Sequence, residues 1–365
     1  MFPKIEKISD IQPHVAGKEE IKFTQHPNGA IIGCALFSDK DTYDSIYTRE
    51  CRGIVFDEKG NVSSRPLHKF FNLNENEEYL YDKVKNKRVF AIYEKLDGSI
   101  VSSANVGGWI FFRSKKSFSS DVVSIADKFI LDHENYYDFC DILMTMGFTA
   151  IFELTSPLKR IVINYPSTKL TLLHVRDNIS GRYELLDPNS PIYDLIKKYN
   201  IPLVKKFDYT LDQAIEACKQ GGIEGFVVQF EDGDMVKIKT KWYCERHRVI
   251  SFLRERDIAE LVLDEKLDDV KSIFNELGID LGIISKIESK VKGYLIEISE
   301  NVDKVYKEDR QLSRKDFAIK NLKNPYFSLL MEKFSQKEPD FIDFYRKNRL
   351  KSDFGLEDVC SQKEE

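Results

Sequence analysis

The sequence predicts an α+β protein in which a domain of antiparallel sheets precedes an all-α C-terminal domain. Three observations lead to this prediction. The chain has 365 residues, more than one ordinary domain of about 100–200 residues contains. Turn-forming residues are concentrated before residue 250, where 14 of the 18 glycines and 9 of the 11 prolines lie. Short apolar runs occupy that region, whereas the residues after it show helical spacing.

Eight short apolar runs before residue 250 are typical of strands, because they are rich in β-branched and aromatic residues and end at turn residues. They lie at 29–37, 52–57, 88–95, 109–114, 148–154, 170–175, 225–230 and 235–239. Helices are expected between some of them, at 120–146 and 211–219. Strands and helices do not alternate regularly, so the pattern favours antiparallel sheets over parallel βαβ units.

The C-terminal part of the chain is predicted to be helical. Apolar residues recur at positions i, i+3 and i+4 in the segments 247–263, 270–278 and 283–306. We therefore expect a first domain at 1–248 and a helical second domain at 249–365.

Composition excludes several classes of protein. The net charge is −5, which argues against passive, charge-driven binding of nucleic acid but allows a local basic cleft. Six dispersed cysteines without a C-x-x-C pair, and six histidines without H-E-x-x-H, make a His/Cys metal enzyme a poor interpretation. A hard cation bound by carboxylates is still possible.

No apolar run reaches the roughly 18 residues of a membrane span, and the N-terminus lacks the apolar region of a secretory signal. We expect a cytoplasmic protein.

Phosphate chemistry in this chain would have to use lysine side chains, because neither GxxxxGK[ST] nor GxGxxG occurs. Lys95 ends an apolar strand and begins the segment Lys95-Leu96-Asp97-Gly98. A lysine at a strand end is usually a solvated cap. Lys237 and Lys239 alternate with apolar residues on a later strand, so both should point to one face and could flank a triphosphate.

Three acidic residues accompany these lysines, namely Asp97, Glu153 and Glu224. Carboxylates would repel a bound phosphate unless a divalent cation stood between them. Asp97 has a second interpretation, as a turn former before Gly98.

The segments at 95–98, 152–153, 170–178, 224–225 and 237–239 resemble, in this order, the motifs of the covalent nucleotidyltransferase superfamily of RNA ligases, DNA ligases and mRNA capping enzymes. Within it the chain is most similar to the phage (T-even type) RNA ligase 1 family. The distinctive segments are ECRGIVFD (50–57), SRPLHKFFNLNEN (64–76), FRSKKS (112–117), FELTSPLKRIV (152–162) and KIKTKWY (237–243).

The resemblance implies a nucleotidyltransferase domain that acts as an ATP-dependent RNA ligase. Such an enzyme joins RNA 3′-OH and 5′-phosphate ends through lysyl-AMP and RNA-adenylate intermediates, with ATP and Mg²⁺ as cofactors and Mn²⁺ as a substitute. The implied catalytic residues are Lys95, Glu153 and Tyr243. The implied nucleotide-binding residues are Arg52, Lys69, Lys95, Glu153, Glu224, Lys237 and Lys239. The expected metal ligands are Asp97, Glu224 and Asp268.

For some of these residues a structural interpretation competes with the functional one. Lys69 could extend over core aromatics at Phe70 and Phe71, Tyr243 could be a packed aromatic, and Asp268 with its neighbour Asp269 could lie on a solvated helix face.

Other expectations concern RNA and the base. Arg113, Lys115 and Lys116 are expected at phosphate or RNA. The segment 170–175 contains His174 but no Tyr, Phe or Trp to stack on adenine, so aliphatic packing by Leu172 or Val228 is expected instead.

The implied partners are RNA ends, expected to be those of tRNA cleaved in its anticodon loop, and a polynucleotide kinase/phosphatase that heals them, with no membrane involved. The helical domain is a candidate for tRNA specificity, and the location is the host cytoplasm if the chain is phage-encoded.

Two alternatives remain at this point. A DNA ligase or capping guanylyltransferase is disfavoured by the helical C-terminal part and by segment 64–76. An RNA-binding protein that has lost catalysis is disfavoured because the expected lysines and glutamates are all present.

Overall fold

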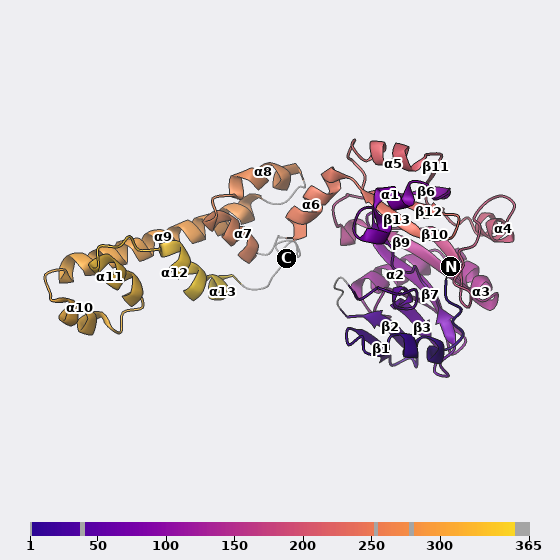
Figure 1. The fold of residues 1–365 in the computed structure, drawn as a ribbon, viewed down its shortest axis with the longest axis horizontal. Coiled ribbons are helices and arrows are strands. Elements are labelled where there is room, and N and C mark those ends of the chain that lie inside the picture. Colours follow the sequence, from indigo (N-terminus) through magenta and orange to yellow (C-terminus); the bar gives the residue numbers. More distant parts are fainter. Residues whose placement is uncertain (1, 37–40, 252–254, 277–280, 355–365) are drawn as a thin grey trace. The chain divides into compact units, whose positions relative to one another are not determined.

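The computed structural model describes residues 2–36, 41–251, 255–276 and 281–354 of the chain (Figure 1). The chain divides into two compact units, Met1–Cys244 and Glu245–Glu365. The expected boundary at 248/249 falls a few residues later, inside a helix that includes residues of both units.

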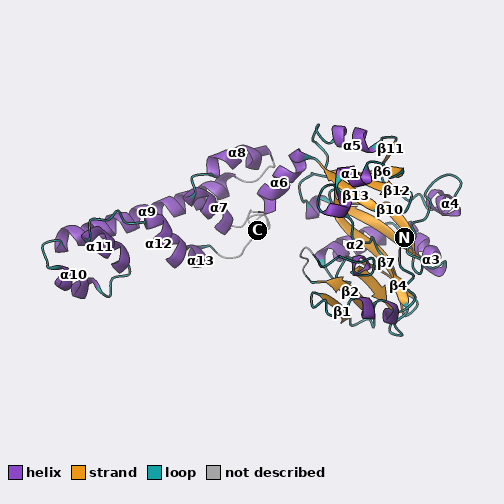
Figure 2. Ribbon diagram, in the orientation of Figure 1, coloured by secondary structure: helices purple, strands orange, loops and turns teal. Residues whose placement is uncertain are grey.

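All strands of the described chain lie in the first unit (Figure 2). The strands are β1 (Ile21–Gln25), β2 (Ile31–Ala35), β3 (Arg52–Phe56), β4 (Val62–Ser64), β5 (Phe71–Asn72), β6 (Val89–Lys95), β7 (Ser99–Val106), β8 (Trp109–Arg113), β9 (Phe148–Thr155), β10 (Lys169–Asp177), β11 (Lys206–Phe207), β12 (Gly225–Phe230) and β13 (Met235–Lys239). They form three sheets, with the orders β1-β2-β3-β4, β10-β9-β7-β8 and β11-β6-β12-β13-β5. Neighbouring strands are antiparallel except β13 and β5, so the predicted fold class is confirmed.

Helices occur in both units. Those of the first unit are α1 (Tyr81–Val84), α2 (Asp121–Leu131), α3 (Asn135–Thr145), α4 (Pro191–Lys198) and α5 (Leu211–Ala217). The remaining helices are α6 (Lys241–Ser251), which crosses the boundary, α7 (Glu255–Leu263), α8 (Leu267–Glu276), α9 (Leu281–Asp309), α10 (Arg314–Asn321), α11 (Phe327–Phe334), α12 (Phe341–Asn348) and α13 (Leu350–Asp353).

Each of the eight predicted strands is present, although residue 37 of the predicted run 29–37 lies outside the described residues. Five strands were not predicted. Four of them, β1, β4, β5 and β11, lie at sheet edges, and the fifth, β7, lies inside its sheet. Its sequence SIVSSANV contains three serines, which are more typical of turns than of strands. Two of them are buried, and the Ser103 hydroxyl accepts a hydrogen bond from the Ala150 amide at 3.1 Å. Because the neighbouring strand supplies this donor, a polar side chain is tolerated in the interior.

The predicted helix at 120–146 is two helices, α2 and α3. The imidazole of His133 stacks on the ring of Phe129, with centroids 4.0 Å apart, and its Nδ1 lies 2.7 Å from the Phe129 carbonyl oxygen. The side chain thereby gives this carbonyl of the last turn of α2 a second partner, besides the Asp132 amide at 3.2 Å. The hydrophobic faces of both helices pack on the sheet β10-β9-β7-β8.

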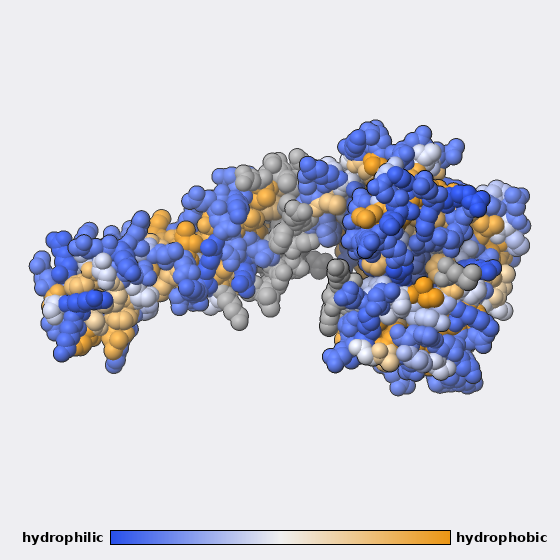
Figure 3. Space-filling model, in the orientation of Figure 1, coloured by the Kyte–Doolittle hydropathy of each residue, from blue (hydrophilic) through white to orange (hydrophobic). Residues whose placement is uncertain are grey.

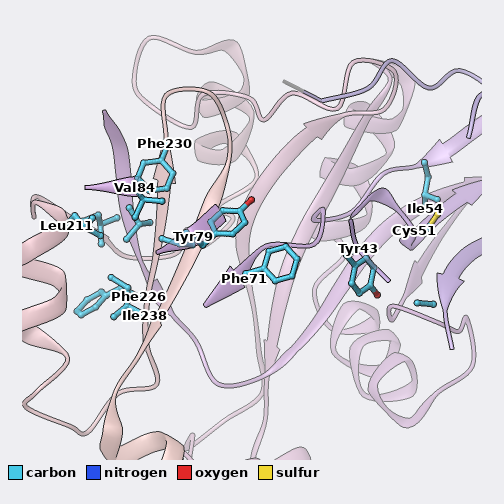
Figure 4. Packing of buried hydrophobic residues seen from close by; sticks show 14 of the residues in the cluster. Tyr43, Cys51, Ile54, Phe71, Tyr79, Val84, Leu211, Phe226, Phe230 and Ile238 are labelled. Atoms are coloured by element: carbon cyan, nitrogen blue, oxygen red, sulfur yellow. The ribbon is translucent and has the colours of Figure 1, made fainter. Parts of the chain in front are cut away.

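One hydrophobic core lies on the five-stranded sheet. Phe226 of β12 and Ile238 of β13 are direct partners in the strand register and lie side by side (Figure 4). Leu211 of α5 belongs to the same core. The Thr210 hydroxyl and the Gln213 side chain cap the start of α5 reciprocally. This core covers one face of the five-stranded sheet, so the other face is available for a site.

A buried ionic cluster connects three segments of the first unit. Glu50 precedes β3, and its Oε1 lies 3.0 Å from Arg65 Nη2 and 2.8 Å from Arg176 Nη2. All three side chains are at most 1% exposed. Burial by itself would raise the pKa of Glu50, but Arg176 and Arg65 outweigh it and lower this pKa to about 2. The cluster joins the start of β3 to β10, and both strands contribute residues to the site described below.

The helical unit is organised around α9. Its buried residues Ile284, Ile287, Val291, Ile298 and Val302 follow the spacing that predicted a helix. Hydrophobic residues also gather on the visible surface over α10 and α11 (Figure 3). In and just after α10, Ile319 and Leu322 are 64% and 66% exposed. No helix in the described part of the chain is long and apolar enough to span a membrane.

Candidate active site

A cavity of about 530 Å³ lies between the five-stranded sheet and the sheet β10-β9-β7-β8. Part of its lining is cationic, namely Arg52, Lys95, Lys115, Lys116, Lys237 and Lys239. Another part is apolar or aromatic and includes Pro66, Leu67, Phe70, Tyr93, Ile100, Leu173, Val204 and Val227. A cavity of this composition suits a ligand that carries both a polyanion and an apolar group.

The lysines enter the cavity because three strands pair in register. Lys95 ends β6 and lies opposite Gly225 of β12, which lies opposite Lys239 of β13. The second row, two residues away along each strand, is Tyr93, Val227 and Lys237. Residues two apart on a strand share a face, and all the side chains of both rows line the cavity. The prediction that Lys237 and Lys239 share one face is confirmed.

Glu224 holds two of these lysines. Its Oε1 lies 2.7 Å from Lys95 Nζ and 3.0 Å from Lys239 Nζ, and its side chain is only 3% exposed. One buried carboxylate therefore contacts both Nζ atoms at the cavity wall.

Asp97 lies behind the cavity and is surrounded by hydrogen-bond donors. Its Oδ2 accepts from the backbone amides of Val162 and Ile163, at 2.8 and 2.6 Å, and its Oδ1 accepts from the Tyr243 hydroxyl at 2.6 Å. Tyr243 is itself buried, and burial followed by the bond to Asp97 raises the pKa of its phenol. This arrangement supports a positioning role for both residues, since neither lines the cavity.

Gly98 allows the turn after Lys95 to approach β9. A Cβ at this position would collide with the carbonyl oxygen of Leu154. The close contact between these two backbones holds Lys95 next to Glu153, the acidic residue of β9 that lines the cavity.

Glu153 is a buried acid that lines the cavity. Burial raises the pKa of its carboxyl group to about 8, the carboxylates of Glu224 and Asp97 contribute to the increase, and Lys95 opposes it. Without a bound cation the carboxyl group is therefore mostly protonated at neutral pH. The folded protein holds this proton more tightly than the unfolded chain, where the pKa is near 4.5. This tighter proton binding contributes to the free energy of unfolding. The contribution is complete below about pH 4.5 and is lost as the pH rises through about 8.

Replacing Glu153 with glutamine, which cannot ionise, is expected to remove this pH dependence. The free energy of unfolding of the wild type should fall relative to E153Q by a few kcal/mol, about 3, between about pH 5 and 8. Urea denaturation at several pH values would measure the difference. Tryptophan fluorescence reports on the correct unit, because Trp109 and Trp242 both lie in Met1–Cys244. A difference between the two proteins that stays constant over this range would contradict the prediction.

The cationic wall carries more positive charge than the described acids neutralise. Burial, and then the charges of Arg52, Lys69 and Lys95, lower the pKa of Lys237 to about 7. The described chain shows no ion pair for Lys237, Arg52 or Lys115. A polyanion would relieve this repulsion, as expected for a site that binds a triphosphate.

Lys69 lies beside this wall but is not part of the cavity lining. Its Nζ is 4.4 Å from the centroid of the Phe71 ring and 3.8 Å from Glu75 Oε1. Phe70 and Phe71 are both buried, as the structural interpretation of this lysine requires. The nucleotide contact expected for Lys69 stays a prediction.

The FRSKKS segment divides into one structural and two exposed cations. Arg113 is fully buried and donates hydrogen bonds to the carbonyls of Gly53 and Ser114, so the expectation that it contacts phosphate or RNA is wrong. Its buried guanidinium instead joins β8 to β3. Lys115 and Lys116 do line the cavity.

The apolar wall differs from the prediction by one residue on each of two strands. Leu172 and Val228 are fully buried in the hydrophobic cores and do not line the cavity. Their neighbours Leu173 and Val227 do. Alternation along β12 places Val227 on the same face as the lysines, and a β-bulge in β10 exposes Leu173.

Aromatic residues of this wall were also not predicted as site residues. Tyr93 is two residues before Lys95 on β6, and the centroid of the Phe70 ring lies 5.5 Å from Lys237 Nζ. Counting back by two from Lys95 would have identified Tyr93, because the strand was predicted correctly. Phe70 could not be found in this way, since it comes from a separate segment.

The acidic residues do not form a complete metal cage. In the described chain no group of three or more His, Cys, Asp or Glu side chains is placed to hold a metal ion. Asp268 belongs to the helical unit, where its exposed carboxylate pairs with Lys271 at 2.7 Å. The metal roles of Asp97, Glu224 and Asp268 stay predictions. The acids of the cavity lining are Glu94 and Glu153.

The fold and the cavity together place a lysine at a strand end in a cation-lined cavity of a size and composition suited to a polyanionic ligand. Residues 50–243 match the family model described as RNA ligase, and residues 251–345 match the model of the T4 RNA ligase 1 C-terminal domain. The chain therefore belongs to the RNA ligase family, and it is an RNA ligase of the T4 RNA ligase 1 type.

Three relatives illustrate the similarity. A Thermovibrio ammonificans protein named as an RNA ligase is 29% identical over 79% of this chain and 77% of its own length. RNA ligase 1 of bacteriophage TS2126 is 28% identical over 66% of this chain and 62% of its own length. A protein of Autographa californica nuclear polyhedrosis virus, named as a bifunctional polynucleotide kinase/RNA ligase, is 27% identical over 62% of this chain and 35% of its own length.

Proposed function

We propose that this protein uses ATP to join an RNA 3′-OH end to a 5′-phosphate end through a lysyl-AMP intermediate. The observation that carries the proposal is that Lys95 shares one cavity with the paired lysines 237 and 239 and with an apolar wall. The cationic wall suits the triphosphate of ATP, and the apolar wall suits its base.

The reaction would proceed in three displacements at phosphorus. The Lys95 amine attacks the α-phosphorus of ATP, forms a P–N bond and expels pyrophosphate. A 5′-phosphate oxygen of the RNA then attacks the same phosphorus, which breaks the P–N bond and gives the RNA-adenylate. Finally the 3′-hydroxyl attacks the 5′-phosphorus, forms the phosphodiester and expels AMP. Glu224, in contact with Lys95, is placed to accept the proton that the amine must lose before it attacks.

Mg²⁺ is the metal we expect with ATP. It usually binds through phosphate oxygens and waters, with one or two protein carboxylates, so a complete protein cage is not required. Glu153 at the cavity wall fits this arrangement, and a cation there would favour its ionised form. When bound, the metal would offset negative charge on the phosphates.

For the substrate, we propose anticodon-cleaved tRNA and a cytoplasmic setting. The support is the match of residues 251–345 to the T4 RNA ligase 1 C-terminal domain. The name of the baculovirus relative combines a polynucleotide kinase with an RNA ligase. We extend this combination to the present protein as a functional pairing with a separate end-healing enzyme.

The proposal is tested by incubating the protein with α-³²P-ATP and MgCl₂, after pyrophosphate treatment to remove any AMP already attached. Acid-stable label on the protein, followed by its transfer to 5′-phosphorylated RNA, is expected. Labelling by α-³²P-GTP instead would favour a capping-type guanylyltransferase. Absence of label with either nucleotide would refute the mechanism.

Replacing Tyr243 with phenylalanine is expected to slow formation of the protein–AMP adduct by about 10- to 100-fold, because Asp97 loses a hydrogen bond to a charged acceptor. Single-turnover labelling over a range of ATP concentrations should show a lower maximal rate with little change in the half-saturating concentration. Tyr81→Phe is the matched control, since it removes a 2.7 Å bond to Asp212 on the protein surface. Equal rates for Y243F and Y81F would contradict the positioning role of Tyr243.

A further inference from the structure

His174 occupies an unusual position in β10. In the pairing of β10 with β9, Leu172 lies opposite Phe152 and His174 lies opposite Ile151, so Leu173 is an extra residue. On a regular strand, neighbouring side chains point to opposite faces, but a β-bulge turns them in similar directions. Both Leu173 and His174 accordingly line the cavity.

The imidazole of His174 is enclosed but has no polar partner. The residue is 5% exposed, and its ring lies between Tyr93 and Tyr183, with centroid distances of 5.3 and 5.0 Å. Within the described residues no hydrogen bond reaches its nitrogens. The neighbouring imidazole of His68, by contrast, has Nδ1 2.8 Å from the Tyr183 hydroxyl. The nitrogens of His174 are not among the fully enclosed, unpartnered atoms of the described chain, which include His68 Nε2. They are therefore open to the cavity that His174 lines, where a ligand can reach them.

The surroundings keep this imidazole neutral. Burial, and then the charges of His68 and Arg176, lower the pKa of His174 to about 3. Arg176 is itself held in place by Glu50. A neutral imidazole retains one nitrogen lone pair that can accept a hydrogen bond, whereas the protonated ring can only donate.

The inference rests on the proposed use of ATP. The apolar wall that contains Tyr93, Leu173 and Val227 is the part of the cavity suited to the base. Adenine carries an amino group at position 6, which donates hydrogen bonds, where guanine carries a carbonyl oxygen. We propose that His174 is a specificity-determining residue that accepts a hydrogen bond from the exocyclic amino group of adenine.

The test compares ATP with purine riboside triphosphate, which lacks only the 6-amino group. Formation of the covalent protein adduct is followed by intact-protein mass spectrometry, and the ratio of kcat/KM for the two nucleotides is measured. The wild type is expected to prefer ATP by about 10- to 100-fold, the effect of one hydrogen bond to a buried group that is otherwise unpaired. In H174L the preference should fall to within about threefold of unity, since no acceptor remains.

Two further variants separate recognition from structural damage. His174→Gln keeps an acceptor oxygen and should retain part of the preference. Leu173→Ala alters the same wall without removing a polar group. It should lower kcat/KM for adduct formation with both nucleotides and leave the ratio of the two values as in the wild type. The ratio does not depend on the fraction of folded enzyme.

Two results would overturn the proposal: a wild type that does not distinguish the nucleotides, or an H174L ratio equal to that of the wild type. A wild type that forms no adduct with either nucleotide is a different outcome, because it would refute the proposed function itself.

Discussion

Replacing Lys95 with alanine is expected to abolish formation of the protein–AMP adduct, with a decrease of at least about 10⁴-fold to below detection. The physical reason is that no other amine can take its place. The Lys95 Nζ is held at 2.7 Å from Glu224, and the neighbouring lysines enter the cavity from a different strand. The rate of α-³²P-AMP transfer to the protein measures the effect.

Two comparisons distinguish loss of the nucleophile from loss of charge or of fold. Lys95→Arg keeps the positive charge beside Glu224 but should form no adduct, since guanidinium is not deprotonated near neutral pH. Lys22→Ala removes an exposed lysine of β1 and should label at the wild-type rate. RNA that already carries a 5′-adenylate bypasses the first two displacements, so K95A should still seal it. Label on K95A would show that another residue is the nucleophile.

Replacing Glu50 with glutamine is expected to destabilise the first unit by about 3–5 kcal/mol, the typical cost of removing one partner from a buried ion pair. The two guanidinium groups of Arg65 and Arg176 would be left adjacent in the interior without a counter-charge. Urea denaturation followed by tryptophan fluorescence measures this unit specifically.

The stabilisation that the Glu50 carboxylate gives the wild type should also depend on pH. It should be present above about pH 4.5 and should decrease as the pH falls through about 2, because the pKa of Glu50 is lowered in the folded state.

Glu78→Gln provides the matched control for E50Q. Glu78 also pairs with an arginine, Arg49, but its side chain is 55% exposed. Its replacement should change the free energy of unfolding by no more than about 1 kcal/mol, as for other surface ion pairs. Equal effects of the two substitutions would show that the buried cluster is not a major source of stability.

The sequence predicted the strands of the site well, because their apolar runs are local features of the chain. It also predicted that Lys237 and Lys239 share a face, which follows from strand alternation alone. It failed at β7, where buried serines depend on donors from a neighbouring strand. It also chose Leu172 and Val228 instead of their neighbours, because a bulge and the side of the sheet that faces the cavity cannot be read from one strand.

For the charged residues too, motifs in the sequence identified candidates, but only the fold showed what each of them contacts. Asp97 was recognised from its motif, but its partners Val162 and Tyr243 are 65 and 146 residues away in sequence. Only folding brings these donors to its carboxylate. Arg113 looked like a phosphate ligand among the cations of its segment, and the packing of β8 against β3 buried it.

The sequence by itself determined the fold class, the strands that carry the lysines, and the family to which the chain belongs. These properties depend on local periodicity and on short motifs, which survive as patterns along the chain. The tertiary structure decided which face of each strand meets the cavity, which acid has a raised pKa, and that His174 lines the cavity. Those properties depend on burial and on contacts between distant segments, and such contacts exist only when the sheets have packed together.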